Sequence, residues 1–343
     1  MTTENDYDHA ERLRETTIEV DGPSGSHAGT RIGYAYDELG RLASKTYGTG
    51  DSPLQIHYTH NMHGELVQQQ SDRFCMSLAY ESPLYVAPSY SGNIVEWTWQ
   101  YGDGDENTYA FSYDNLSRLT NTKQYLDGTC VDRFVEQGIA YDRNGNMLSL
   151  DRSRGDGTGS DFSYMYEGNR LVSLVDSGEN YSYTYDTNGN LIHDGANNLD
   201  ITYNDLNQIE KVNRDGAVLA NFSYLANGQK YMTSAANGSG LCYVGSLVYE
   251  RSSSGQSLEL ESLGFDGGRF IKTTSGLEPR YFITDHLGSV RVVVNDQGEV
   301  LEQNDYYPFG LRWENAESPI TDNRYRYNGK EEQSFVSVPY IDY

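Results

Sequence analysis

One short turn is repeated along this chain, and that repetition constrains the fold more than any other feature. The stretch IAYDRNGNML at residues 139–148 is one copy: an aromatic anchor followed by an acidic residue, a glycine, and an apolar residue that begins the next strand. Successive anchors lie 18 to 53 residues apart, which favours hairpins with variable far loops over a solenoid with fixed rungs. Nine copies align on the anchor: Tyr7, Tyr36, His60, Tyr113, Tyr141, Tyr166, Tyr185, Tyr203 and Tyr224.

Each copy contains the residues that an antiparallel hairpin needs. A second aromatic residue often stands two positions before the anchor, as Tyr34 does before Tyr36, so both rings lie on one side of a strand. The acidic residue can accept hydrogen bonds from the backbone ahead of it, and the glycine supplies a positive φ. The repeat-motif residues expected to form such turns include Tyr36, Asp37, Gly40, Tyr141, Asp142, Gly145, Tyr185, Asp186 and Gly189, with a further turn near Gly64.

A single hairpin of this kind is marginally stable in water and needs neighbours that pair with it. We therefore predict an all-β fold: an extended antiparallel sheet of repeated Tyr-Asp hairpins, curved or spiral, with little helix over residues 1–315. The composition agrees, because 30 tyrosines and 35 glycines suit short strands and tight turns. We expect one worn copy between His60 and Tyr113, around LAYESPLYV or WTWQYG.

Charge and hydropathy exclude several partners. Fifty acidic and 25 basic residues give a net charge of -25, which repels phosphate backbones, so we predict no nucleic-acid partner. No apolar run approaches the ~18 residues of a membrane span, so we predict no membrane insertion. Three widely spaced cysteines form neither a disulfide framework nor a zinc pattern, and the first residues, MTTENDYDHAERL, carry no secretory signal.

The C-terminal part carries two further motifs, which together with the repeats resemble a known family. The segment 281–310 contains TDHLGSVR and YYPFG, and RYRYNGKEEQ follows at 324–333. The chain resembles bacterial Rhs or YD-repeat proteins, with a YD-repeat array over residues 1–250 and an Rhs repeat-associated core domain over 251–343. The residues that carry the core-domain resemblance are Asp285, His286, Leu287, Gly288, Ser289, Val290, Arg291, Tyr307, Pro308, Phe309, Gly310, Tyr327, Asn328, Gly329 and Lys330.

The resemblance implies a function as well as a fold. Such proteins wind a spiral sheet into a hollow β-shell, or cocoon, that encloses a C-terminal toxin and is secreted or associated with the cell envelope. This sequence stops before the family's self-cleavage segment and toxin. The resemblance thus implies a non-enzymatic scaffold whose partners are a toxin polypeptide, the remainder of the shell and a secretion-system component. The alternative is a cell-surface adhesion or carbohydrate-binding module, in which the tyrosine stripe stacks on sugars.

Because the chain begins and ends inside the repeat pattern, we also expect unpaired strands at both ends and a shell that this chain alone does not close.

Three motifs invite chemical interpretations that we do not favour. Asp285, His286 and Ser289 are the residue types of a hydrolase triad, but neighbouring residues of a strand or turn point in different directions. We instead predict a strand and an Asp/Gly turn, with Val290, Val292 and Val294 alternating into a core.

The other two motifs lie in polar loops. GDGDEN places Asp103, Asp105 and Asn107 at calcium-loop spacing, but Thr108 stands where that loop needs glycine and Asp114 where it needs glutamate. We expect a solvated acidic loop there, and no metal or cofactor elsewhere. The RGD at residues 154–156 sits in a stretch dominated by glycine and aspartate, so chance composition explains it.

Overall fold

The computed structural model describes residues 1–21, 27–50, 53–253, 255, 257–314, 323–333, 336–338 and 341–342. Within them the prediction of an all-β fold is confirmed: strands follow one another along the chain, and no α-helix occurs among the described residues. Consequently no helix in the described part of the chain is long and apolar enough to span a membrane.

The strands form two large antiparallel sheets in which neighbours in sequence are neighbours in space. The first sheet consists of β1 (Thr2–Tyr7), β2 (Leu13–Asp21), β3 (His27–Tyr36), β4 (Leu42–Tyr47), β5 (Leu54–His60), β6 (Leu66–Gln70), β7 (Cys75–Ala79), β8 (Glu96–Gln100), β9 (Asn107–Tyr113), β10 (Leu119–Leu126) and β11 (Thr129–Val131).

The second sheet consists of β12 (Glu136–Tyr141), β13 (Met147–Ser153), β14 (Gly159–Glu167), β15 (Arg170–Asp176), β16 (Glu179–Tyr185), β17 (Leu191–Asp194), β18 (Leu199–Tyr203), β19 (Ile209–Arg214), β20 (Ala217–Tyr224), β21 (Lys230–Ser234), β22 (Gly240–Val244), β23 (Leu247–Arg251), β24 (Leu258–Phe265), β25 (Gly268–Thr273), β26 (Gly276–Thr284), β27 (Val290–Asn295) and β28 (Val300–Gln303). Pairing continues from β23 to β24, across the domain boundary predicted at residue 250, which stays a prediction.

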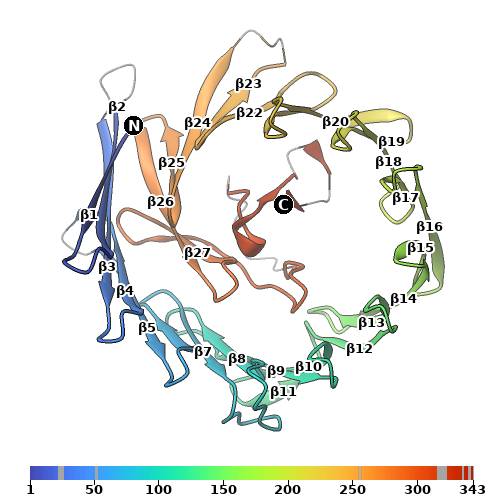
Figure 1. The fold of residues 1–343 in the computed structure, drawn as a ribbon, viewed down its shortest axis with the longest axis horizontal. Helices are drawn as coiled ribbons and strands as arrows, with labels where there is room; N and C mark the ends of the chain where they lie inside the picture. The colour runs from blue at the N-terminus through green and yellow to red at the C-terminus, as the bar shows by residue number, and fades with distance from the viewer. Residues whose placement is uncertain are drawn as a thin grey trace.

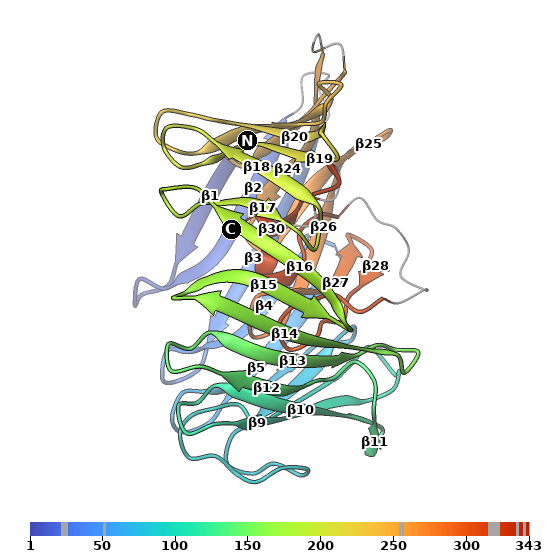
Figure 2. The ribbon, with the colours of Figure 1, turned by 90° about the vertical axis from the view of Figure 1, so that its right-hand side faces the viewer.

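The two sheets continue one wall that curves into a ring. β12 lies beside β10, where the Thr122 hydroxyl donates to the Glu136 carbonyl at 2.7 Å. Viewed down its axis, the wall runs once round an enclosed space, and β24–β27 return to lie against the inner side of β1–β5 (Figure 1). Seen from the side, the strands of β12–β20 lie one above another along the wall, inclined to its long direction (Figure 2).

The ring closes where its last strands pack face to face against its first ones, a contact that we call the seam. The Thr30 and Tyr281 hydroxyls lie 2.8 Å apart, and the Tyr34 hydroxyl donates to Asp266 at 2.9 Å. This packing brings the two ends of the wall together without pairing their edge strands, so the expectation that this chain alone does not close a shell stays a prediction. Among the described residues β1 still pairs only with β2, and all six of its residues are exposed.

The seam also contains the main hydrophobic core. Side chains from the inner face of β2–β9, such as Ile32, Ile56 and Trp99, pack with Phe270 and Ile283 from the returning strands. As predicted, Val290, Val292 and Val294 are buried, but Arg291 and Val293 on the opposite face of β27 are buried too. The alternation pattern missed this because β27 is covered on both faces.

The described residues of the C-terminal segment, 304–314, 323–333, 336–338 and 341–342, turn inward and lie inside the ring (Figure 1). The segment includes the 3-10 turn η1 (Tyr327–Gly329) and the short strands β29 (Glu331–Glu332) and β30 (Ile341–Asp342). Val336 and Val338 pack against Leu199, Ile201 and Val212 of the opposite wall. The chain thus fills part of its own enclosure. The predicted truncation before the self-cleavage segment falls at Tyr343, which lies outside the described residues.

The predicted turns are present, with Gly40, Gly64, Gly145 and Gly189 at φ values between +80° and +90°. The copy at Tyr166 differs, because Glu167 pairs directly with Arg170 and leaves a shorter turn. The worn copy is at LAYESPLYV: the Tyr80 hydroxyl donates to the Leu66 carbonyl at 3.0 Å, as the anchors of intact copies do, and a long loop follows it.

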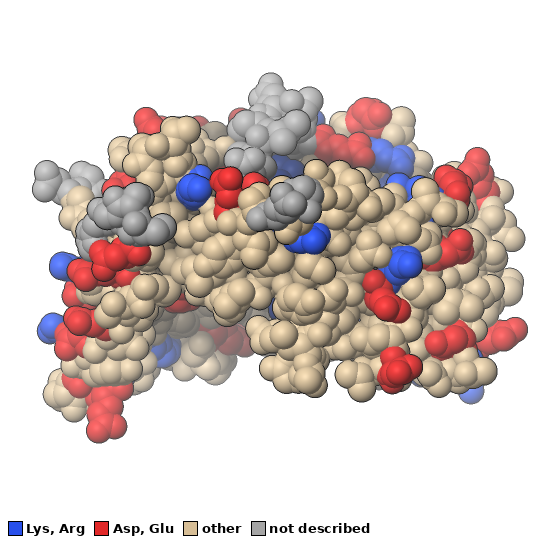
Figure 3. All heavy atoms as spheres, turned by 90° about the horizontal axis from the view of Figure 1, so that it is seen from above, with Lys and Arg blue, Asp and Glu red and all other residues tan. Residues whose placement is uncertain are grey.

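The face of the molecule seen from above carries more acidic than basic side chains among its described residues, in line with the net charge of -25 (Figure 3). Aspartates and glutamates are scattered over the flanks of the ring in this view, and lysines and arginines are fewer.

Candidate functional site: the repeat ladder and the internal C-terminal segment

Most anchor tyrosines link their repeat to the one before it. The Tyr36 hydroxyl donates to the Leu13 carbonyl at 2.9 Å, and the Tyr185 hydroxyl donates to the Leu171 carbonyl at 2.9 Å. The accepting residue lies at or close to the start of the preceding return strand. The same bond recurs from Tyr80, Tyr113, Tyr141, Tyr203 and Tyr224. These hydroxyls are used in holding the sheet together.

The acidic residue after each anchor organises the turn. Asp37 accepts the backbone N–H groups of Leu39 and Arg41 through Oδ1, and its Oδ2 accepts the Arg41 Nε at 2.6 Å. These hydrogen bonds lower the pKa of Asp37. Arg41 then reaches the next turn, where its Nη1 donates to the Asn61 carbonyl at 2.8 Å. The arginine side chain of one turn and the backbone carbonyl of the next thus form a second series of bonds between successive turns.

The C-terminal signature motifs are further copies of the same turn. In TDHLGSV the Asp285 Oδ1 accepts the backbone N–H groups of Leu287 and Ser289, just as the Asp37 Oδ1 accepts those of Leu39 and Arg41. In YYPFG the Tyr306 hydroxyl donates to the Val290 carbonyl at 2.9 Å. In RYRYNGK the Gly329 N–H donates to the Arg326 carbonyl at 3.1 Å. The predicted Asp/Gly turn at TDHLGSVR is confirmed. Sequence reasoning missed the kinship of the three turns with the repeat, although glycines 288, 310 and 329 keep the repeat's spacing.

Arg291 joins the signature to the opposite sheet. Its side chain is fully buried, pairs with Asp305, and lies 3.9 Å from Asp285. Five aromatic rings surround the guanidinium at 4.9–5.8 Å, those of Phe74, Trp97, Trp99, Tyr101 and Tyr306. Asp305 also accepts the Trp99 Nε1 at 2.8 Å. The cation therefore ties β27 and the C-terminal segment to β8 and to the residues beside β7 and β8.

The three triad residue types lie close together but are not aligned for catalysis. The Ser289 hydroxyl accepts the Asn328 N–H at 3.1 Å, whereas His286 packs edge-on against Trp97 and its Nδ1 has no hydrogen-bond partner among the described residues. Burial lowers the pKa of His286 to about 4 and raises the pKa of Asp285, against the opposing effect of Arg291. A neutral imidazole that does not contact the hydroxyl is poorly placed as its base.

The YYPFG turn docks on the wall. The Phe309 N–H donates to the buried Glu136 Oε2 at 2.9 Å, and the Tyr307 hydroxyl donates to the Ser153 carbonyl at 2.9 Å. Arg152 holds the other Glu136 oxygen at 2.6 Å. The signature residues Leu287 and Pro308 make no polar side-chain contact, since their side chains carry no polar group.

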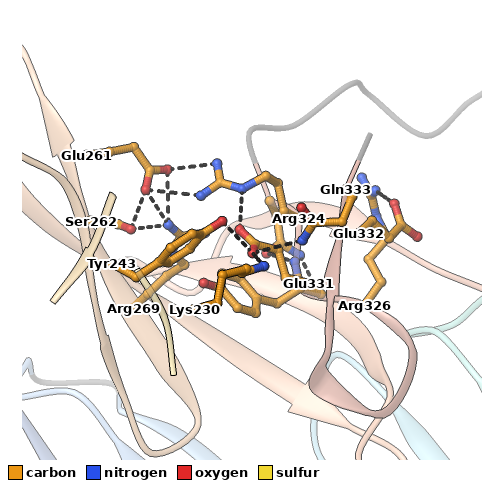
Figure 4. A network of polar contacts seen from close by, with 12 residues as sticks. Lys230, Tyr243, Glu261, Ser262, Arg269, Arg324, Arg326, Glu331, Glu332 and Gln333 are labelled. Carbon is orange, nitrogen blue, oxygen red and sulfur yellow. Dashed lines mark hydrogen bonds and ion pairs between the residues drawn. The ribbon is translucent and has the colours of Figure 1, made fainter. Parts of the chain in front are cut away.

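A polar cluster fixes the end of the C-terminal segment (Figure 4). We define it as Lys230, Tyr243, Glu261, Arg269, Arg324 and Glu331. Arg324 donates to Glu261 of β24 at 3.2 Å and to Glu331 of its own segment at 2.9 Å. The Tyr243 hydroxyl of β22 donates to Glu331 at 2.8 Å. Burial alone would raise the pKa of Glu261, but Arg269 and Arg324 outweigh it and lower the pKa.

The remaining candidate residues lie in or beside polar turns. Asp103 and Asp105 belong to the loop between β8 and β9, Asn107 is the first residue of β9, and no group of three or more metal-ligating side chains occurs in the described part of the chain. In the RGD stretch the Arg154 Nη2 donates to the Ser160 hydroxyl at 2.9 Å, so that arginine is engaged within its own hairpin.

Comparison with known proteins identifies the family. A model of the Teneurin YD-shell family matches residues 89–320, about two thirds of the chain. The chain belongs to the Teneurin YD-shell family. Residues before 89 lie outside the match yet form the same hairpins and the same tyrosine ladder. No curated protein sequence matches the chain significantly.

Solved structures agree on the fold of this YD-shell chain. A crystal structure of TcdB2-TccC3 is similar with a TM-score of 0.61 and 14% identity, over 94% of this chain and 20% of that one. A crystal structure of TcdB2-TccC3 without its hypervariable C-terminal region has a TM-score of 0.60 and 15% identity, over 94% of this chain and 19% of that one. The chain thus spans about a fifth of the length of these similar chains. At such identity the likeness shows the fold alone.

Proposed function

We propose that this chain is a non-enzymatic section of an Rhs-type toxin shell, and that it encloses a toxin polypeptide absent from this sequence. The observation that carries the proposal is the course of the C-terminal segment. It enters the ring and is held there by Arg324 and Glu331 of the polar cluster, so a polypeptide continuing after it starts inside the enclosure.

The family and the fold support this proposal. The chain belongs to the YD-shell family, and its fold is like that of TcdB2-TccC3. One form of TcdB2-TccC3 is described without a hypervariable C-terminal region. Both findings are expected of a shell with an exchangeable C-terminal cargo. The partners in this proposal are the toxin, the remainder of the shell and a secretion-system component, and its place is secreted or at the cell envelope. The core domain over 251–343 is then the signature-bearing part that turns inward.

The role proposed for the signature residues is structural. Asp285, Ser289 and Arg291 organise a turn and a buried ion pair, and His286 fills space against Trp97. The competing adhesion function draws no support from the anchor tyrosines whose hydroxyls bond to the backbone of the preceding repeat, such as Tyr36 and Tyr185.

Protease protection tests the proposal. A flexible reporter peptide fused after Tyr343 should be digested more slowly than the same reporter fused before Met1, because only the first begins inside the ring. Digestion of both reporters at one rate, in a chain whose melting temperature is unchanged, would contradict the proposal. A glycan array addresses the adhesion alternative separately.

A further inference from the structure

At one place in the wall, side chains replace the pairing of backbones. Strand pairing runs unbroken from β1 to β11 and from β12 to β28, and in the described part of the chain it does not connect the two sheets. β12 instead lies beside β10, near the bottom of the ring in Figure 1. We call this contact between β10 and β12 the joint.

Two hydroxyl groups hold the joint together. The Thr122 hydroxyl donates to the Glu136 carbonyl at 2.7 Å and accepts the Glu136 N–H at 2.9 Å, so one side chain occupies both backbone groups of that residue. Nearer the rim, the Tyr141 hydroxyl donates to the Leu119 carbonyl at 2.8 Å. Separating β10 from β12 therefore requires a few side-chain bonds to break, and both sheets can keep their own backbone pairing.

The shape of β12 explains why its backbone does not pair regularly with β10. Gly138 has φ +62°, and the register between β12 and β13 shifts between Gln137 and Ala140. A bulge of this kind bends and twists the strand that contains it and leaves part of its backbone without a regular partner. The sequence of β12 thus builds the joint into the wall.

Part of the C-terminal segment, residues 306–313, bridges the joint, and we call it the docked segment. On the β12 side, the Phe309 N–H donates to the Glu136 Oε2 at 2.9 Å. On the β9 side, the Trp313 Nε1 donates to the Tyr109 hydroxyl at 3.2 Å. Between them the Trp313 ring stacks on Phe134, with ring centroids 3.9 Å apart. The docked segment therefore binds both sheets at the point where their backbones do not pair.

We propose that the wall opens locally at the joint, and that the docked segment keeps it closed. Undocking removes the bonds to Glu136 and Tyr109, after which β12 can move away from β10 while the paired strands on both sides persist. The opening leads into the space inside the ring, where the C-terminal segment lies. The inference concerns the wall of this chain and does not depend on the toxin-shell function.

Native-state hydrogen exchange of the full chain, read by NMR, tests the opening. The Glu136 amide should exchange about tenfold or more faster than the most protected amides of β13 and β14, because a local opening releases it while those strands stay paired. Its exchange should also depend only weakly on urea, since a local opening exposes little surface. If the Glu136 amide exchanges as slowly as those of β13 and β14, with the same urea dependence, it is released only by global unfolding and the proposal is wrong.

A variant of the docked segment tests its role in closing the joint. Tyr307→Phe keeps the ring and removes the hydrogen bond to the Ser153 carbonyl, so the Glu136 amide should exchange about five- to tenfold faster, the effect of one lost hydrogen bond. The matched control is Tyr185→Phe, which removes an anchor hydroxyl bond elsewhere in the wall and should leave the Glu136 amide unchanged. Equal effects of the two variants would show that the docked segment does not close the joint.

A variant of the joint tests the same coupling from the other side. Thr122→Val keeps the shape of the side chain and removes both bonds to Glu136. The Phe309 amide is the reporter, because the substitution does not touch its own bond, and it should exchange about fivefold or more faster. The control is Thr98→Val, whose hydroxyl bonds to Thr108 where β8 and β9 are also paired through their backbones. A Phe309 amide that exchanges equally fast in both variants would contradict the proposal.

Discussion

The hydroxyl of Tyr141 donates a 2.8 Å hydrogen bond to the backbone carbonyl of Leu119, the first residue of the return strand in the preceding repeat. A phenylalanine could fill the same space but could not make this bond. The ladder therefore gives a reason for the excess of tyrosine over phenylalanine, 30 against 10, that stacking alone does not give.

Removing one tyrosine hydroxyl from the ladder should lower the free energy of unfolding by about the contribution of one hydrogen bond. Tyr141→Phe is expected to lower the free energy of unfolding by about 1 kcal/mol, because the Leu119 carbonyl loses its partner in a half-buried site. Urea unfolding measures this. The control is Tyr181→Phe, whose hydroxyl bonds only to exposed Glu179 and whose removal should cost little. Equal losses in the two variants would show that the ladder does not stabilise the sheet.

The turn glycine should tolerate no side chain. Gly145 has φ +90°, so Gly145→Val should destabilise by about 1–3 kcal/mol, and Gly189→Val should do the same. Asn144→Ser in the same turn should be nearly neutral. Gly33→Ala is a second control, because Gly33 does not have a positive φ and the added methyl group would meet only Thr46 at 3.7 Å. Equal melting shifts for all four variants would mean that the turn is wrongly assigned.

The turn aspartates should make stability depend on pH in the acid range. The Asn146 side chain and nearby N–H groups lower the pKa of Asp142, so its stabilising effect is present above its unfolded-state pKa and is lost as the pH falls through the folded-state value. Asp142→Asn keeps an acceptor, as Asn61 and Asn204 do in their copies, but cannot titrate.

Melting temperatures measured from pH 7 to pH 2 check this. The parent chain should exceed Asp142→Asn most at neutral pH, and the gap should shrink below about pH 4. Asp186→Asn, in the equivalent turn, should behave alike. A gap that stays constant across the series would contradict the assignment.

The buried cation should be hard to replace. Arg291→Met leaves Asp305 and Asp285 without their cationic partner in a dry site, and should destabilise by about 3–5 kcal/mol. The exposed Arg143→Met is the matched control and should change the free energy of unfolding by less than about 0.5 kcal/mol. If Arg291→Met unfolds at the same midpoint urea concentration as the parent chain, the ion pair contributes no net stability.

The exposed edge of β1 should promote association once charge repulsion is screened. The net charge of -25 keeps chains apart at low ionic strength, and salt shortens the range of that repulsion. We expect light scattering to show a single-chain mass in dilute buffer and a rising mass as salt increases, because unpaired strand edges pair with other chains. A single-chain mass at every salt concentration would show that the edge is protected.

The structure within one repeat could be predicted from the sequence, whereas contacts between distant parts of the chain could not. The hairpins follow from residues within one copy, such as Asp142 and Gly145, so alignment of the repeats was sufficient. The signature turns at YYPFG and RYRYNGK escaped because Tyr307 and Arg326 stand where the repeat has an acidic residue, whereas the Asp/Gly turn at Asp285 was predicted. The seam joins Tyr34 to Asp266, 232 residues apart, and no periodic pattern specifies which two strands meet after a full circuit.

The seam constrains the number of hairpins, because the two ends of the wall meet in register only when its circumference is right. Each hairpin adds two strands, and hence about 10 Å, to the circumference of the wall. Inserting or deleting one copy between Tyr34 and Asp266 would leave the turns and tyrosine bonds of the other copies intact, yet it would carry Asp266 past Tyr34 and Lys45. Repeats in this part of the chain can therefore vary in sequence outside their anchor and turn residues, but not in number.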